Sequence, residues 1–126
     1  MLKTKTTDKT LGRLKKRPEF LFVAKGDYAA RGCILIQQRK HETRETGVKV
    51  GFTCTKKVGN SVVRSRCKRV MREAARTHLP ALGLEGHDYV FIARHSLPGA
   101  SHEQLQTDTQ KALAKLTGAR HNTANS

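Results

Sequence analysis

KKVGNSVVRSRCKRVMREAAR, residues 56–76, joins a helical apolar stripe to eight cations and a single acid. Apolar side chains recur at intervals of three and four residues, which places them on one face of a helix: Val63, Cys67, Val70, Met71 and Ala74. Asn60 is the expected N-cap because its side-chain oxygen can accept from a backbone N–H two or three residues on. The stretch therefore predicts an amphipathic helix that begins near Ser61 and packs on a core.

The rest of this helix is cationic. At about 100° per residue, six basic side chains cover the arc outside the stripe: Arg64, Arg66, Lys68, Arg69, Arg72 and Arg76. Like charges spaced i,i+4 cost a few tenths of a kcal/mol each, so an unrelieved row of them indicates a polyanion-binding face. The alternative is a charged face that is merely solvated.

The whole chain has the same bias. Its 25 Lys and Arg against 10 Asp and Glu give a net charge of +15 over 126 residues, which favours nucleic acid as a partner. An anionic membrane is the competing target, but no apolar run approaches the ~18 residues of a membrane span, and no signal-peptide core is seen. We expect a cytoplasmic protein with one domain at 11–117, a flexible basic arm at 1–10 and a disordered tail at 118–126.

The cysteines and histidines do not indicate a protein-based active site. Cys33, Cys54 and Cys67 are widely spaced and form no CxxC pair, so we expect three small buried residues in a reduced cytosol. The histidines show no HExxH spacing and no triad pattern with a serine and an acid. We predict no catalytic residue in the protein, and the sequence leaves its metal sites unknown.

The remaining elements indicate an α+β fold. We expect a short helix at 18–24, strands at 32–39 and 48–55 paired antiparallel, a buried central strand at 88–94 and a last helix from 101 or 102 to about 116, capped by Ser101. A loop with Pro80, Gly83 and Gly86 should follow the basic helix. The order α-β-β-α-β-α predicts a two-layer α/β sandwich, with one mixed sheet and its helices on one face.

Four segments together resemble the bacterial ribonuclease P protein subunit. They are the basic stretch at 56–76, GFTCTKK at 51–57, RLKKRPEF at 13–20 and DYVFIAR at 88–94, and the resemblance covers roughly residues 11–116. It implies a protein cofactor, one per large catalytic RNA, that assists endonucleolytic removal of the 5′ leader from precursor tRNA. It also implies that the RNA supplies the active site and holds most of the Mg²⁺, and that the β-α-β crossover is left-handed, as in one ribosomal protein domain.

The resemblance assigns roles to individual positions. The residues that match the family's RNA-facing motif are Lys56, Lys57, Asn60, Arg64, Arg66, Lys68, Arg69 and Arg72. Arg64 and Arg66 are the principal candidates because a guanidinium can hold two phosphate oxygens at once. Ser65 stands where the family usually has asparagine, so the charges of its Arg-Asn-Arg pattern remain without the amide.

A cleft between the sheet and the basic helix is implied for the single-stranded leader. The candidate leader-binding residues are Phe20, Ile36, Phe52, Arg13, Lys15 and Lys16. Phe20 matches a family aromatic, whereas Ala24 and Ile36 replace two others, and Phe22 or Phe52 would compensate. Exposed rings stack on any base, by about 1–3 kcal/mol each. The alternative is that all three phenylalanines are core residues.

Two other functions are compatible with part of the sequence. A structural ribosomal protein would share the charge and fold but would not confer processing on a precursor tRNA. A self-sufficient nuclease needs clustered carboxylates or a histidine pair. The carboxylates outside the basic helix are instead scattered along the chain or lie in a polar loop, and they include Asp8, Asp27, Asp88, Asp108, Glu42 and Glu45.

Overall fold

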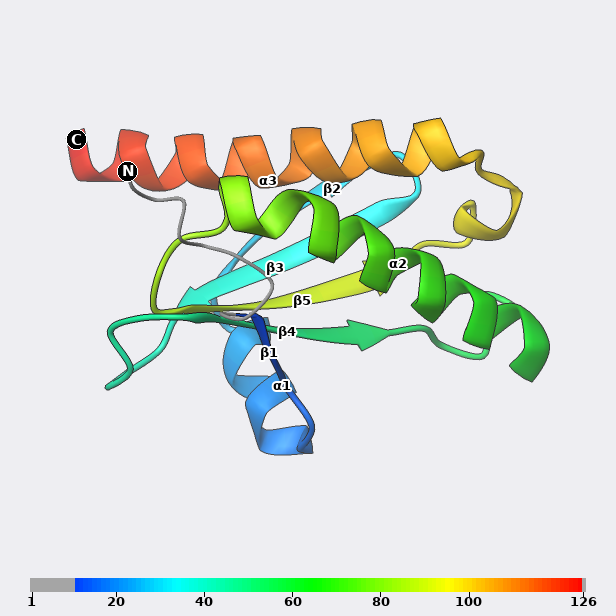
Figure 1. Ribbon diagram of the computed structural model, residues 1–126, viewed down its shortest axis with the longest axis horizontal. Helices are drawn as coiled ribbons and strands as arrows, with labels where there is room; N and C mark the ends of the chain where they lie inside the picture. The colour runs from blue at the N-terminus through cyan, green and yellow to red at the C-terminus, as the bar shows by residue number, and fades with distance from the viewer. Residues whose placement is uncertain (1–10, 126) are drawn as a thin grey trace.

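The fold consists of a five-stranded sheet and three α-helices (Figure 1). A computed structural model describes the backbone of residues 11–125 and the side chains of residues 11–118. In chain order the elements are β1 (Leu11–Arg13), α1 (Arg17–Ala24), β2 (Asp27–Arg31), β3 (Ile34–Lys40), β4 (Val48–Thr53), α2 (Ser61–Leu82), β5 (His87–Ala93), the short 3-10 turn η3 (Leu97–Gly99) and α3 (His102–Asn125). The α+β class with a mixed sheet is confirmed.

The sheet has the strand order β1-β4-β5-β3-β2. β5 pairs in parallel with β4, where Val50 lies opposite Tyr89, and antiparallel with β3, where Ile36 lies opposite Phe91. Its sequence HDYVFIA is buried at every position except the partly buried Ile92. Such continuous burial suits a strand covered on both faces, and the predicted central position of this segment is confirmed.

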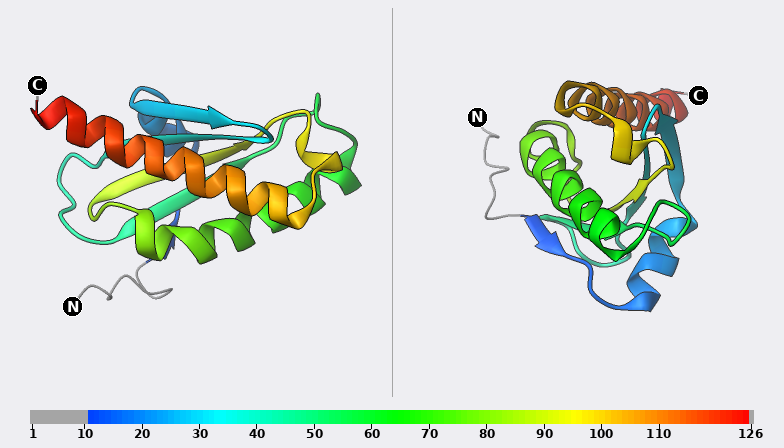
Figure 2. Two further views of the ribbon diagram at one scale, coloured as in Figure 1. Left: turned by 90° about the horizontal axis from the view of Figure 1, so that it is seen from above. Right: turned by 90° about the vertical axis from the view of Figure 1, so that its right-hand side faces the viewer.

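The helices divide between the two faces of the sheet. α2 and α3 lie side by side over one face (Figures 1 and 2), where they enclose the larger core, which includes Ile36, Phe91, Met71 and Leu113. α1 packs on the other face in a smaller cluster with Leu14, Val23 and Val90 at its centre. The expectation that the helices cover one face thus holds for α2 and α3, and α1 is the exception.

Two features of the sheet correct the sequence-based expectation. The predicted pairing of residues 32–39 with residues 48–55 is wrong: β3 and β4 run antiparallel, but β5 lies between them. The connection between them crosses the start of β5, where the Arg44 guanidinium bonds the Asp88 carboxylate at 2.6 Å. Two strands, β1 and β2, were also missed. β1 pairs with β4 and β2 pairs with β3, so they form the two edges.

Two helices are longer than expected. α2 continues past Arg76 to Leu82, because Leu79 extends the buried stripe and Pro80 falls in the last turns. α3 continues past Leu116 to Asn125, into the segment expected to be a tail. The side chains from 119 onward, like the expected arm at 1–10, lie outside the described residues. α2 links the parallel neighbours β4 and β5, and the left-handed sense of this crossover stays a prediction.

Candidate nucleic-acid interface

The basic helix starts where the sequence predicts. The Asn60 side-chain oxygen accepts from the Val63 N–H at 3.0 Å, which satisfies one of the free donors of the first turn. Gly59 has no room for a side chain, since a Cβ there would lie 2.8 Å from the Val63 side chain. On the inner face Cys67, Met71 and Ala74 are buried as predicted. This apolar contact fixes which way the opposite face points.

The opposite face of α2 presents its cations to solvent. The exposed basic side chains on α2 and in the turn before it are Lys56, Lys57, Arg66, Lys68, Arg69 and Arg76, and Arg64 and Arg72 are half-buried. Within residues 11–118, the only salt bridge found joins Arg44 to Asp88, so no carboxylate is paired with a cation of α2. These charges are therefore available to an anionic partner.

Arg64 and Arg66 differ in setting. The Nε of Arg64 is buried and has no hydrogen-bond acceptor in the described part of the chain, and the residue as a whole is half-buried. Arg66 is exposed and borders two surface depressions, one of them shared with Arg69. Both guanidinium groups lie at the N-terminal half of α2.

A cavity of about 200 Å³ lies between the outer edge of the sheet and α2. Its walls come from β1, β4 and α2, and they are formed by Leu11, Gly12, Arg13, Val50, Phe52, Arg72, Ala75 and Arg76. Three cations and one aromatic ring thus meet at the place where the resemblance puts a leader cleft. The Phe52 ring is partly buried and packs edge-on against Phe91, with the ring centroids 5.8 Å apart.

The other predicted leader residues lie elsewhere. Phe20 is partly buried on the α1 face of the sheet, where its ring covers Gly51 so closely that a Cβ there would lie 2.6 Å away. Lys15 and Lys16 are exposed just before α1, and their backbone N–H groups bond the Glu19 carboxylate at 2.7 and 2.9 Å. These hydrogen bonds hold the pKa of Glu19 below its ordinary value.

The structure corrects the assignment of Ile36 to the leader-binding set. Its side chain is 0% exposed and lies in the core between the sheet and the α2–α3 layer, so it is closed to a leader strand in this structure. Neighbouring strand residues point to opposite faces, and Ile34, Ile36 and Gln38 all point inward with burial. The structure thus separates the predicted leader set into a cavity group, an α1 group and one core residue.

One exposed aromatic residue was missed. Tyr28 in β2 is 67% exposed, whereas the other five Phe and Tyr side chains of the described region are buried or half-buried. β2 has the sequence DYAAR, which lacks the apolar alternation that marks a strand, so no local signal indicates an exposed ring at this position. The Tyr28 ring is the most exposed of the Phe and Tyr rings in the described residues, and an exposed ring can stack on a base.

The described residues do not form a metal or thiol site. No three His, Cys, Asp or Glu side chains of this part of the chain converge as metal ligands. Cys33, Cys54 and Cys67 are free and buried, as expected. Burial raises the pKa of the Cys33 thiol to about 12 and that of Cys67 to about 11, so neither is a thiolate near neutral pH.

None of the helices within the described residues is long and apolar enough to span a bilayer.

The chain is similar to named proteins over most of its length. It is 46% identical over 104 residues to the ribonuclease P protein component of Caulobacter vibrioides, covering 82% of this chain and 70% of the relative. Against the ribonuclease P protein component of Ruegeria pomeroyi it is 46% identical over 105 residues, covering 82% and 84%.

Solved structures show the same fold. The Staphylococcus aureus RNase P protein superposes with a TM-score of 0.71 at 25% identity, covering 82% of this chain and 94% of that one. The Thermotoga maritima RNase P protein superposes with a TM-score of 0.63 at 23% identity, covering 79% and 96%. Residues 9–117 match the family described as Ribonuclease P, and the chain belongs to that family as a ribonuclease P protein component.

Proposed function

We propose that this chain binds the catalytic RNA of ribonuclease P through the outer face of α2. Membership of the family implies tRNA 5′-leader processing together with an RNA subunit. The observation that supports the RNA-binding face is the row of α2 cations without a carboxylate partner in the described residues. Arg64 and Arg66 each hold two phosphate oxygens. Around them, the lysines act as single positive charges and the other arginines can bind phosphate in the same bidentate way: Lys56, Lys57, Lys68, Arg69 and Arg72.

The electrostatics favour a bridging role. A precursor tRNA and a large RNA repel each other, and a chain with a net charge of +15 placed between them lowers that repulsion. The leader is the part that distinguishes substrate from product, so a protein that also contacts the leader favours the precursor. We assign this contact to the cavity group, Arg13 and Phe52, and to the α1 group, Phe20, Lys15 and Lys16.

The RNA, in this proposal, supplies the active site and holds most of the Mg²⁺. Mg²⁺ prefers carboxylate and phosphate oxygens, and the described residues offer no cluster of three His, Cys, Asp or Glu side chains. The protein's own residues neutralise phosphates and position the substrate. One protein per RNA and a cytoplasmic location complete the proposal.

Reconstitution tests the cofactor role. Cleavage of a precursor tRNA is measured at low Mg²⁺ with ribonuclease P RNA from the same organism, with the protein, and with both. The expected result is efficient cleavage only in the combined reaction. Failure of the protein to stimulate the RNA would favour a structural RNA-binding protein, and cleavage by protein alone would indicate a self-sufficient nuclease.

Leader contact is tested with single substitutions. Phe52→Ala and Phe20→Ala are each compared for binding of the holoenzyme to precursor tRNA and to mature tRNA. We expect weaker precursor binding with little change for mature tRNA, by a factor set by stacking energies of about 1–3 kcal/mol per base. Circular dichroism checks folding, because both rings also pack in the protein. Equal losses for both RNAs would contradict a leader contact.

A further inference from the structure

A second depression on α2 is a groove of about 280 Å³ between α2, η3 and the start of α3. Its floor consists of the buried side chains Cys67, Leu97 and Leu105. Val63 and Val70 line it from α2. This is a mainly apolar hollow set into the most cationic part of the molecule, and neither the family motif nor the leader cleft assigns a role to it.

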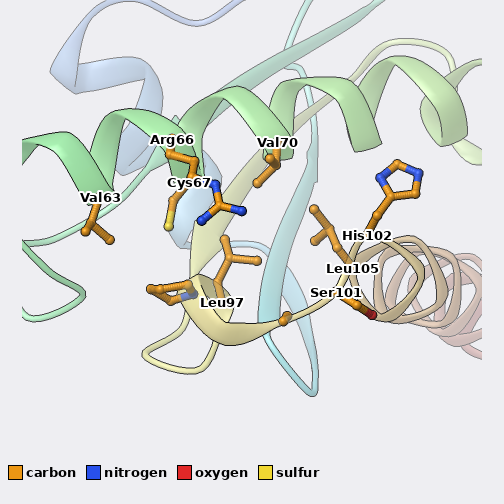
Figure 3. Close-up of a pocket in the computed structure, with 10 residues that line it drawn as sticks. Val63, Arg66, Cys67, Val70, Leu97, Ser101, His102 and Leu105 are labelled. Atoms are coloured by element: carbon orange, nitrogen blue, oxygen red, sulfur yellow. The ribbon is translucent and has the colours of Figure 1, made fainter.

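The rim of the groove is polar and basic. Arg66 borders it from α2, and Ser101 and His102 border it from the α3 side. Figure 3 shows the Arg66 guanidinium reaching over the groove, with the His102 ring on the side of α3. No carboxylate is among the residues that line it. Arg69 is exposed on the same helix face and shares a shallow neighbouring depression with Arg66.

We propose that this groove receives one unpaired nucleobase of the catalytic RNA, whose flanking phosphate is bound by Arg66. The inference rests on the proposed function, because it assumes that the RNA lies on the outer face of α2. A base splayed out of an RNA loop has two flat faces, which stack on aromatic rings or arginine guanidinium planes, and polar edges that form hydrogen bonds. The groove offers apolar walls and Arg66 for the faces, and Ser101 and His102 for the edges. The phosphate next to it carries the negative charge that the rim complements.

Size and charge favour a base over other occupants. The volume of about 280 Å³ lies just below the ~300–1,000 Å³ range of pockets for drug-sized ligands, so it suits one ring system rather than a folded segment. An apolar peptide helix needs a long groove with several anchor points. A basic rim without carboxylates also favours an anionic partner over a basic one.

Filling the groove without changing its charge is the direct test. Val70→Phe narrows it from α2, and Ala100→Leu narrows it from the other wall; both leave Arg66 in place. We expect each to weaken binding of ribonuclease P RNA by about tenfold, equivalent to about 1.4 kcal/mol. The matched control is Ala114→Phe, an exposed position on α3 that does not line the groove and lies outside the proposed RNA-binding face, and it should leave affinity unchanged. Thermal melts show whether each variant folds.

A second measurement locates the base directly. Ribonuclease P RNA with sparse 4-thiouridine or 6-thioguanosine is bound to the full chain, irradiated and mapped by mass spectrometry. Crosslinks on peptides containing Cys67 or Leu97, lost in Val70→Phe, are expected. Crosslinks confined to the cationic outer arc, or unchanged RNA affinity of both folded groove variants, would overturn the proposal.

The outcomes separate this inference from the proposed function. If the wild-type protein binds and stimulates the RNA but the groove variants behave like wild type, only the nucleobase site fails. If the wild-type protein neither binds nor stimulates the RNA, the proposed function itself fails. If the groove variants impair binding of leader-containing precursor but not of the catalytic RNA, the occupant is the leader, and the assignment to the catalytic RNA is wrong.

Discussion

Removing Arg64 and Arg66 together should weaken RNA binding and make it less sensitive to salt. Both are half-buried or exposed cations of α2 without a carboxylate partner in the described residues, so each is free to replace a counterion on a phosphate. The variant Arg64→Gln/Arg66→Gln keeps polar side chains and a similar helix propensity while removing two charges. Its affinity for ribonuclease P RNA is measured by filter binding between 50 and 200 mM KCl.

The size of the effect follows from counterion release. Each phosphate contact contributes about 0.7–0.9 to the slope of log K against log salt, so two contacts contribute about 1.4–1.8. Over a fourfold rise in salt, this slope corresponds to a factor of about ten. The wild-type protein should therefore bind the RNA much more tightly than the variant at 50 mM. The ratio of the two affinities should be about tenfold smaller at 200 mM.

A matched pair separates local contact from overall charge. Lys111→Gln/Lys115→Gln removes the same two charges from exposed positions on α3, and we expect its slope to stay close to that of the wild-type protein. Equal slopes for the α2 and α3 pairs would show that only net charge matters. An unchanged slope in the α2 pair would refute the phosphate contacts outright.

Further predictions concern the fold that supports this face. Asn60→Ala removes the acceptor of the Val63 N–H and should lower the free energy of unfolding by about 1 kcal/mol in urea melts, whereas Asn60→Asp should restore it. Gly32 has a φ of +51°, and a Cβ there would collide with the Asp108 carboxylate; Gly32→Ala should destabilise the protein by more than about 1 kcal/mol in the same assay. Burial tends to raise the pKa of Asp108, but hydrogen bonds from Gln104 and from the Cys33 N–H outweigh it and place the pKa below 3.8. The stability due to this carboxylate is thus fully present above about pH 4 and is lost as the pH falls through the lowered pKa. In melts recorded as a function of pH, Asp108→Asn should reduce this loss of stability at acidic pH.

Local signals explain why α2 was predictable. Its cap, its apolar stripe and its charged arc all lie within one stretch of sequence, and each depends on side chains three or four residues apart. Asn60 caps the helix as expected. The end of α2 at Leu82 was not predicted, because a proline such as Pro80 usually indicates that a helix ends before it. In the last turns of a helix, proline removes only one donor and can be accommodated when packing continues.

Strand neighbours were less predictable because pairing is non-local. DYAAR forms β2 through its ladder with β3 and the burial of Ala29, neither of which its own sequence announces. β5 separates β3 from β4 because its apolar run is best satisfied at the centre of the sheet. A sequence-adjacent hairpin was the simpler expectation, but it leaves no place for β5 between β3 and β4.

The candidate site shows the same division. The cations of α2 could be read from periodicity, but the meeting of Arg13, Phe52 and Arg72 in one cavity depends on β1 lying beside β4. The assignment of Ile36 came from matching a family position, which carries no information about the face on which this aliphatic side chain is buried. Its zero exposure indicates that this position is part of the hydrophobic core in this protein.

Charge alone does not account for the interface, because the fold decides where the charge points. The buried stripe of Cys67, Met71 and Ala74 holds α2 against the sheet between the parallel neighbours β4 and β5, so the opposite arc is fixed relative to the body of the protein. A flexible basic segment of equal charge would bind RNA with similar salt dependence but would pay ordering entropy on binding. The cavity on one flank of α2 and the groove on the other are then presented together, on either side of one row of cations. An RNA that docks on this row therefore meets both hollows in a fixed geometry, which is a means of recognising shape in addition to charge.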